Sequence, residues 1–131
     1  MRPAAAVLAA VLLPVLAGCG SPVDEAAART RVEAERIGRV MTLVNARRSA
    51  ADYARTAENE RGPYDLRVRA LAARGDKFEG GAVVVLQITV TGTFSGRFGG
   101  KGATVSATRC YRYTIENRTD DDEPEEVACR R

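Results

Sequence analysis

The sequence predicts an α+β fold, in which one N-terminal amphipathic helix packs on a four-stranded antiparallel meander. Apolar residues recur with the helical period of about 3.6 residues in the first part of the chain. From Tyr64 onward they recur at every second residue, which is the period of half-buried strands. Glycine-rich or polar connections separate these strand-like segments, as in antiparallel hairpins. A helix laid on one face of the sheet would bury both apolar surfaces.

The predicted helix runs from Asp24 to about Asn45. This segment is rich in alanine, arginine and glutamate, which favour helices, and Asp24 and Glu25 suit the positive end of the helix dipole. Its apolar residues gather on one side of a helical wheel, and we expect them to face the core: Val32, Ile37, Val40, Met41, Leu43 and Val44. Alanines beyond Asn45 partly continue the stripe, so the helix either extends or restarts as far as Ala57.

Four segments carry strand patterns. The first covers residues 64–70, the third covers 103–116, and a short last strand is expected near 127–130. The second, at 82–91, is the clearest, because its apolar residues share one face and its polar residues share the other: Gln87, Thr89 and Thr91. A helix followed by a meander is similar to the order of elements in cystatin-like folds, and this likeness of architecture carries no function.

The first 18 residues have the three parts of a secretory signal peptide. Arg2 supplies the positive start, residues 4–17 form an uncharged apolar run, and small residues precede Cys19. The run is 14 residues long, whereas a membrane-spanning helix needs about 20 apolar residues. Pro14 and the segment Gly20-Ser21-Pro22 also disfavour a continuous helix. We therefore expect a segment that is removed rather than one that stays in the membrane.

The segment Leu16-Ala17-Gly18-Cys19 resembles the lipobox of bacterial lipoprotein precursors, and the resemblance covers only this end of the chain. In that family a lipoprotein signal peptidase cuts before the cysteine, whose thiol carries a diacylglyceryl group with acyl chains such as palmitate. The resemblance implies a signal peptide at 1–18, a short tether at 19–23 and one α+β domain at 24–131. Lipid on Cys19 would then hold the domain on the extracytoplasmic face of the cell membrane. The alternative is an ordinary secreted protein that is cut at another site.

The three cysteines leave an even set only if lipid consumes Cys19. Cys110 and Cys129 then remain as one pair in an oxidising compartment, and we expect a disulfide that joins the third strand to the last. Cys110 shares its phase with polar residues such as Thr108, so the bond should lie on the polar face of the sheet. A redox role is disfavoured because the chain lacks a Cys-x-x-Cys spacing and any histidine.

Composition argues against several function classes. The chain has no histidine, which removes the usual general base and the commonest metal ligand, so we expect no enzyme and no bound cofactor or metal. A net charge of +3 and an aromatic content of 5% do not suit a nucleic-acid partner. The abundance of alanine, arginine, valine and glycine is typical of actinobacterial proteins from high-GC genomes.

Two loops are candidates for contact with a partner. The glycine-rich stretch at 95–102 is predicted to be a flexible hairpin loop, in which Arg97, Phe98 and Lys101 form a contact patch. The acidic stretch at 120–126 lacks the alternation and the glycine of an EF-hand loop. We interpret it as a solvated hairpin loop, and binding of calcium or of a basic partner is the alternative.

These features together predict a lipid-anchored, non-enzymatic domain that binds a partner in the cell envelope, through the open face of its sheet or its glycine-rich loop. Two alternatives stay open. An enzyme could gather acids such as Asp65 in a cleft that the sequence does not reveal. A structural lipoprotein would have no discrete ligand.

Overall fold

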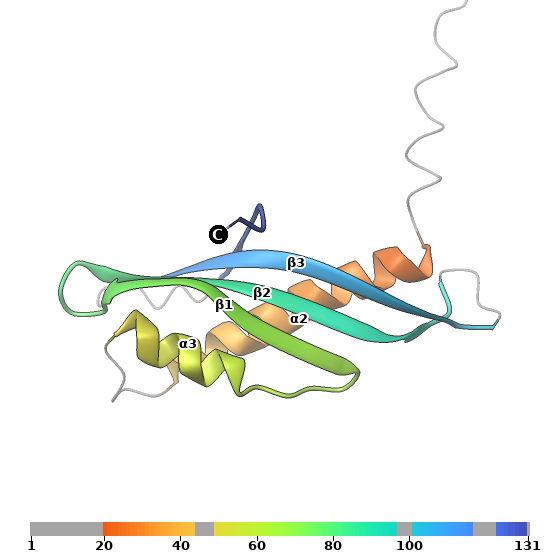
Figure 1. The fold of residues 1–131 in the computed structure, drawn as a ribbon, viewed down its shortest axis with the longest axis horizontal. Coiled ribbons are helices and arrows are strands. Elements are labelled where there is room, and N and C mark those ends of the chain that lie inside the picture. The colour runs from red at the N-terminus through yellow and green to blue at the C-terminus, as the bar shows by residue number, and fades with distance from the viewer. Residues whose placement is uncertain (1–19, 44–48, 97–100, 117–122, 131) are drawn as a thin grey trace, which may run out of the picture.

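The computed structural model describes residues 20–43, 49–96, 101–116 and 123–130 (Figure 1). Its elements are helices α2 (Pro22–Thr42) and α3 (Ala50–Glu58) and strands β1 (Asp65–Asp76), β2 (Gly81–Phe94), β3 (Ala103–Ile115) and β4 (Glu125–Val127). The strands form one antiparallel sheet in the order β1-β2-β3-β4, which confirms the predicted α+β class and meander. The predicted signal peptide and Cys19 lie outside the described residues.

Both helices cover the same face of the sheet. α2 packs on β2 and β3, and α3 packs on β1 and β2. The buried side chains of the two helices belong to one core with those of the strands. In Figure 1, α3 lies on one side of the strands and the C-terminal segment lies on the other. We call the face without helices the open face.

The presence of α3 corrects the prediction of a single N-terminal helix. α2 ends at Thr42 rather than at Asn45. A second helix then begins at Ala50, so the chain restarts a helix instead of extending the first one. Ser49 explains where the second helix begins, because its Oγ accepts a hydrogen bond at 3.2 Å from the backbone N–H of Asp52. A side-chain acceptor at this position satisfies one of the free N–H groups of the first turn.

α2 also begins earlier than the predicted Asp24. Ser21 Oγ accepts a hydrogen bond at 3.1 Å from the backbone N–H of Asp24, and Pro22 is the first residue of the helix. Proline is tolerated in a first turn, because the N–H that it lacks would have no partner within the helix. The cap and the proline together extend the helix into the segment predicted as a tether.

β2 is the central strand of the core. Its helix-facing side chains are 0% exposed, which confirms the predicted apolar face: Ala82, Val84, Leu86, Ile88 and Val90. Alternate residues of a strand point to opposite faces, so Gln87, Thr89 and Thr91 belong to the open face.

The predicted apolar stripe of α2 is only partly correct. Ile37 and Met41 are fully buried, but Val32 is 48% exposed and Leu43 is 76% exposed. Small and polar residues make up most of the face that α2 buries: Ala26, Thr30, Glu33, Ala34 and Gly38. The face needs small side chains because the sheet beneath it presents large ones.

Tyr111 and Tyr113 of β3 are these large partners, and neither is more than 2% exposed. The Tyr111 hydroxyl lies 2.8 Å from Thr30 Oγ1, and the Tyr113 hydroxyl donates to the backbone O of Ala34 at 2.7 Å. Burial raises the pKa of both phenols, because the charged phenolate would lose its water. Each ring thus brings its polar tip to a partner on α2.

Replacing Tyr113 with phenylalanine should lower the free energy of unfolding by about 1 kcal/mol at neutral pH, since the bond to Ala34 is lost. The pKa of Tyr113 is higher in the folded chain than in the unfolded chain, so the folded protein keeps a proton that the unfolded protein releases. The stability of the wild type should therefore fall as the pH rises above about 10. Urea titrations at neutral and alkaline pH should show that the free energy of unfolding falls less with rising pH in the variant than in the wild type. An equal fall in both proteins would refute the role of Tyr113 in this pH dependence.

Glu33 is a buried carboxylate that ties α2 to the loop between α3 and β1. It is 1% exposed and accepts hydrogen bonds from Arg29 Nη2 at 3.0 Å and from Arg36 Nε at 2.7 Å. Arg36 also reaches Glu60 Oε2 at 3.2 Å and the backbone O of Arg61 at 3.0 Å. A buried charge needs such partners. One of them, Arg36, also holds the loop between α3 and β1 against α2.

The first and last strands differ in extent from the sequence pattern. β1 reaches Asp76 rather than ending near residue 70, because a register shift between Ala70 and Ala72 interrupts the alternation without ending the strand. Tyr64 precedes the strand with a positive φ of 69° and stacks on Phe94, with ring centroids 4.9 Å apart. β4 covers Glu125–Val127 rather than 127–130.

Candidate functional site

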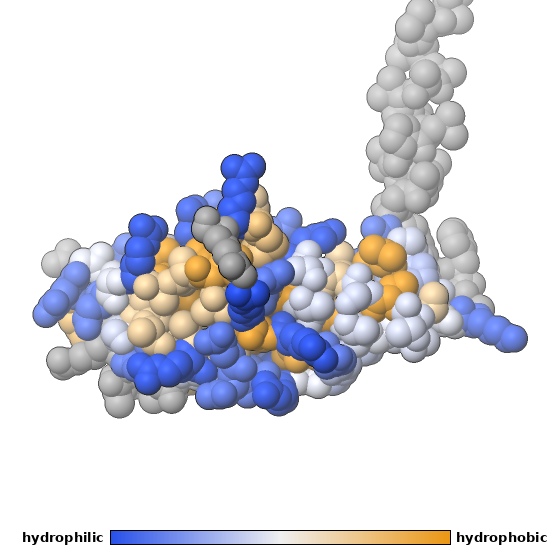
Figure 2. All heavy atoms as spheres, viewed as in Figure 1, coloured by the Kyte–Doolittle hydropathy of each residue, from blue (hydrophilic) through white to orange (hydrophobic). Residues whose placement is uncertain are grey.

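The open face of β2 and β3 carries hydroxyl side chains in cross-strand pairs, which we call the hydroxyl ladder: Thr89–Thr108, Thr91–Ser106 and Thr93–Thr104. In each pair the two oxygens are hydrogen-bonded to each other, at 2.8 Å in the first pair and 3.1 Å in the last. In Figure 2 the surface over this part of the two strands is pale, the colour of weakly polar residues. The ladder therefore forms an ordered, uncharged polar surface.

The pairing leaves the ladder able to bind further groups. A hydroxyl can donate one hydrogen bond and accept two. Each of the three pairs uses one O–H as donor, so within the described part of the chain the other O–H of each pair can donate outward. Thr93, Thr104 and Ser106 are exposed to solvent. Regular strand spacing would hold these donors and acceptors in fixed positions for a flat polar ligand.

Arginines of β1 border the ladder. The register places Arg67 opposite Thr89 and Arg69 opposite Gln87, so their side chains point to the open face. Arg67 is 78% exposed in its side chain and lies 3.6 Å from an exposed carboxylate of Asp65. An exposed ion pair of this kind is weak in water, which leaves the guanidinium able to exchange partners. The open face thus combines a neutral polar strip with a basic margin.

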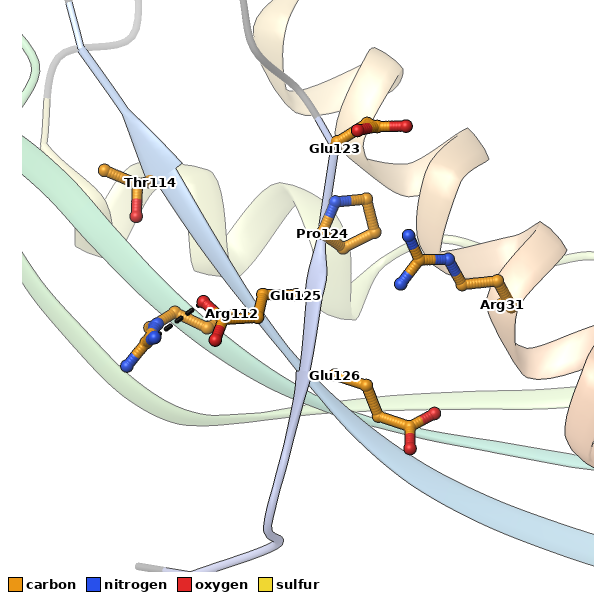
Figure 3. Close-up of a pocket in the computed structure, with 7 residues that line it drawn as sticks. All are labelled: Arg31, Arg112, Thr114, Glu123, Pro124, Glu125 and Glu126. Carbon is orange, nitrogen blue, oxygen red and sulfur yellow. Dashed lines mark hydrogen bonds and ion pairs between the residues drawn. The ribbon is translucent and has the colours of Figure 1, made fainter.

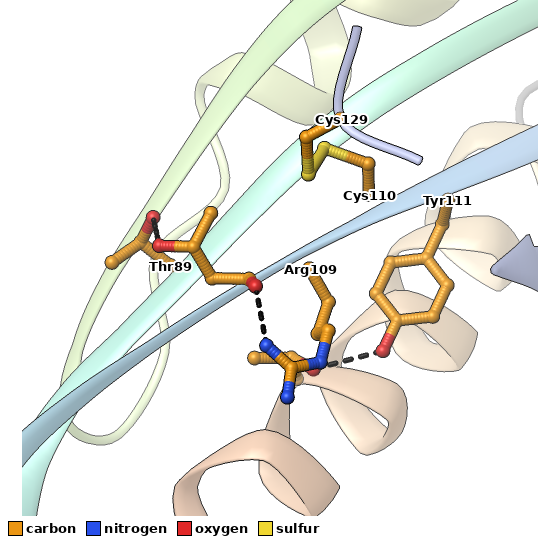
Figure 4. Close-up of a disulfide and its surroundings, with 7 residues drawn as sticks. Thr89, Arg109, Cys110, Tyr111 and Cys129 are labelled. Carbon is orange, nitrogen blue, oxygen red and sulfur yellow. Dashed lines mark hydrogen bonds between the residues drawn. A yellow bond between two sulfur atoms is a disulfide. The ribbon is translucent and has the colours of Figure 1, made fainter. Parts of the chain in front are cut away.

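The disulfide between Cys110 and Cys129 lies on the same face. The two Cα atoms are 5.2 Å apart, and the bond joins β3 to the segment after β4 (Figure 4). Cys110 is opposite Gln87, in phase with the ladder, as the sequence predicted. The expectation that Cys129 lies within the last strand is wrong, because Val127 is the residue opposite Cys110 and β4 ends there.

A hollow lies beside β4. Its lining includes those acidic residues of the predicted hairpin loop that are among the described residues. It is lined by Arg31, Arg112, Thr114 and the segment Glu123-Pro124-Glu125-Glu126 (Figure 3). Arg112 Nη2 and Glu125 Oε2 are 2.6 Å apart, and in Figure 3 Arg31 points toward the other side of β4, near Pro124 and Glu126. Arginines therefore face these carboxylates from two elements. Within the described residues, no cluster of three or more candidate ligands for a metal ion is present.

The predicted contact patch of the glycine-rich loop is described only in part. Arg97 and Phe98 lie outside the described residues, and Lys101 is exposed at the start of the segment that leads into β3. The acids at 120–122 likewise lie outside them, and Glu125 and Glu126 belong to β4 rather than to a loop.

The hydroxyl ladder is the feature that sequence reasoning missed. Its signal is present in the chain, as threonine or serine at every second position in two neighbouring strands. The pattern becomes a set of pairs only once the register is known, because a shift by one residue would turn the side chains of one strand to the opposite face.

Comparisons with protein-family models, curated proteins and solved structures returned no match. Among the helices that the structure describes, none is long and apolar enough to cross a membrane.

Proposed function

We propose that this chain is a lipid-anchored, non-enzymatic domain on the extracytoplasmic face of a bacterial cell membrane, and that it binds an envelope partner through its open face. The observation that carries the binding proposal is the hydroxyl ladder beside the β1 arginines. These side chains form an ordered surface. The two helices pack on the opposite face of the sheet and do not cover it.

The lipid anchor rests on the lipobox-like segment that ends at Cys19. If Cys19 carries lipid, only Gly20 and Ser21 separate it from the first turn of α2. The domain would then stand directly on the bilayer surface rather than on a long flexible linker. The Cys110–Cys129 disulfide is consistent with an oxidising compartment outside the cytoplasm.

The open face favours recognition of a polar or anionic partner. Hydroxyl pairs supply donors and acceptors at regular spacing, and Arg67 and Arg69 add positive charge along one margin. Guanidinium groups bind carboxylate and phosphate groups through paired hydrogen bonds. A partner with repeated hydroxyl and acidic groups would satisfy both parts of the surface.

Cross-linking in living cells tests the binding proposal. A photoreactive residue placed at the exposed Asp65, opposite Thr91 on the open face, should capture a discrete envelope species, and Thr89→Val with Thr108→Val should abolish that capture. These changes keep side-chain shape while removing one rung of the ladder. The matched control is Thr42→Val on α2, whose hydroxyl donates to backbone O atoms of its own helix. Capture that is insensitive to the valine pair, or no capture, would refute the role of the ladder.

Cell fractionation tests the anchor. The wild-type chain should be recovered in the membrane fraction, and Cys19→Ala should move it to the soluble or uncleaved precursor pool, since the thioether has no other attachment point. A Cys110→Ala and Cys129→Ala chain, which lacks the disulfide but keeps Cys19, should remain in the membrane fraction. Equal membrane recovery of processed wild-type and Cys19→Ala chains would exclude a lipid anchor at this residue.

A further inference from the structure

One edge of β3 is unpaired over much of its length. β2 pairs with the whole of β3, from Ala103 to Ile115, along the other edge. On the free side, β4 pairs only with the segment from Cys110 to Arg112. Within the described residues, the segment 103–109 thus has a neighbour on one side only, and alternate N–H and C=O groups face outward.

The disulfide lies where β4 ends. Val127 lies opposite Cys110, and Cys129, two residues further on, is bonded to that same Cys110. The chain therefore turns off the edge and onto the open face, where Arg130 N donates to Ala128 O at 3.0 Å. Continued pairing in the same register would have placed Cys129 opposite Thr108, but Cys129 is instead bonded to Cys110.

The outer edge of β1 is protected by comparison. A register shift lies between Ala70 and Ala72, and the backbone N–H of Ala70 donates to Glu58 Oε2 at 3.3 Å. Ser49 bridges to Asp76 at the far end of the strand. Four charged residues also lie along this strand before that end: Asp65, Arg67, Arg69 and Arg74. Bulges, charges and side-chain caps are the usual devices that keep a sheet edge from pairing with another chain.

The free edge of β3 has almost none of these devices. The segment Ala103-Thr104-Val105-Ser106-Ala107-Thr108 contains no charge, proline or glycine, and half of it is β-branched. Among the described residues, Arg109 contacts this edge: its Nη1 donates to Thr108 O at 2.8 Å, and its side chain is exposed. An uncharged, regular edge of this kind is a template for strand addition.

We propose that two copies of this chain pair through this edge, with β3 antiparallel to β3 of the second copy about a two-fold axis at Ser106. This register uses the whole free segment, placing Ser106 opposite Ser106 and Thr104 opposite Thr108. Val105 then lies opposite Ala107 on the helix side. On the open face the facing side chains are uncharged hydroxyls, and they repeat the hydroxyl pairs that β3 already makes with β2. The two hydroxyl ladders become one surface that crosses the axis.

Analytical ultracentrifugation of the full chain in density-matched detergent tests the pairing. The wild type should have the mass of two chains over a concentration series. Ser106→Lys should raise the dissociation constant by roughly ten-fold or more, because two ammonium groups would face each other across the axis. The control is Thr91→Lys, at the position on β2 opposite Ser106. In the dimer the two lysines at position 91 would be separated by about a Debye length or more, so this variant should change the dissociation constant by no more than about two-fold.

Cross-linking gives a second readout that does not depend on an added charge. In a Cys19→Ala chain, Ser106→Cys should form a covalent dimer with a short bis-maleimide, whereas Thr91→Cys should not. A wild type with the mass of one chain throughout the series, or equal weakening by Ser106→Lys and Thr91→Lys, would overturn the proposal. So would a Ser106→Cys chain that folds, as judged by its circular dichroism, and gives no covalent dimer.

Discussion

Replacing Cys129 with alanine is expected to lower the free energy of unfolding by about 3 kcal/mol. The bond closes a loop with a sequence separation of 19 residues, and it restricts the unfolded chain more than the folded one. Cys129 is the better residue to replace, because it is exposed, whereas Cys110 is 1% exposed and its loss would also leave a cavity. For a domain of this size, such a change removes a large part of the total stability.

Urea denaturation with and without a reducing agent measures this effect. Reduction of the wild type should reproduce the loss seen in Cys129→Ala, and the variant itself should not respond to the reductant. A wild type with the same midpoint in both conditions would show that the bond is not formed in the purified protein.

Replacing Glu33 with alanine should cost about 3 kcal/mol, because it removes the common partner of two arginines from a buried position. Glu33 is 1% exposed, and the side chains of Arg29 and Arg36 are each about one third exposed. Without the carboxylate, these guanidinium groups must turn to water, and Arg36 loses its alignment with Glu60 and the backbone O of Arg61. The loop before β1 would then detach more easily from α2.

The same helix offers a matched control. Glu35 pairs with Arg31 at 3.2 Å with the same spacing along α2 as Glu33 with Arg29, but the side chains of Glu35 and Arg31 are both more than 40% exposed. Glu35→Ala should therefore cost less than about 1 kcal/mol. Thermal and urea unfolding of the two variants measure the contrast. Equal costs would mean that burial of Glu33 contributes nothing to the strength of its ion pairs.

The sequence predicted best the parts of the fold that follow a single period. β2 keeps strict alternation from Ala82 to Val90, and its buried face was correctly predicted from that pattern alone. In β1 the alternation is interrupted by the register shift near Ala70, so the pattern covered only half of the strand. The helical wheel placed Val32 in the core because it counts apolar residues, and it takes no account of the tyrosines that α2 must accommodate.

The candidate site depended on information that no local pattern holds. Cys110 and Cys129 were paired from their number and from the expected compartment, and the structure contains that bond. The hydroxyl ladder requires the register between β2 and β3, and the free edge of β3 requires the point at which β4 ends. The register is a relation between two strands, and the end of β4 is a relation between β3 and the C-terminal segment, so neither can be found within a single segment of the sequence.

Mass spectrometry of the mature N-terminus tests the central claim most directly. We predict that the chain isolated from bacterial membranes begins at Cys19 and carries a diacylglyceryl group on the Cys19 sulfur. An unmodified Cys19, or a mature chain that begins at another residue, would contradict the proposal that this domain acts while anchored to the membrane surface.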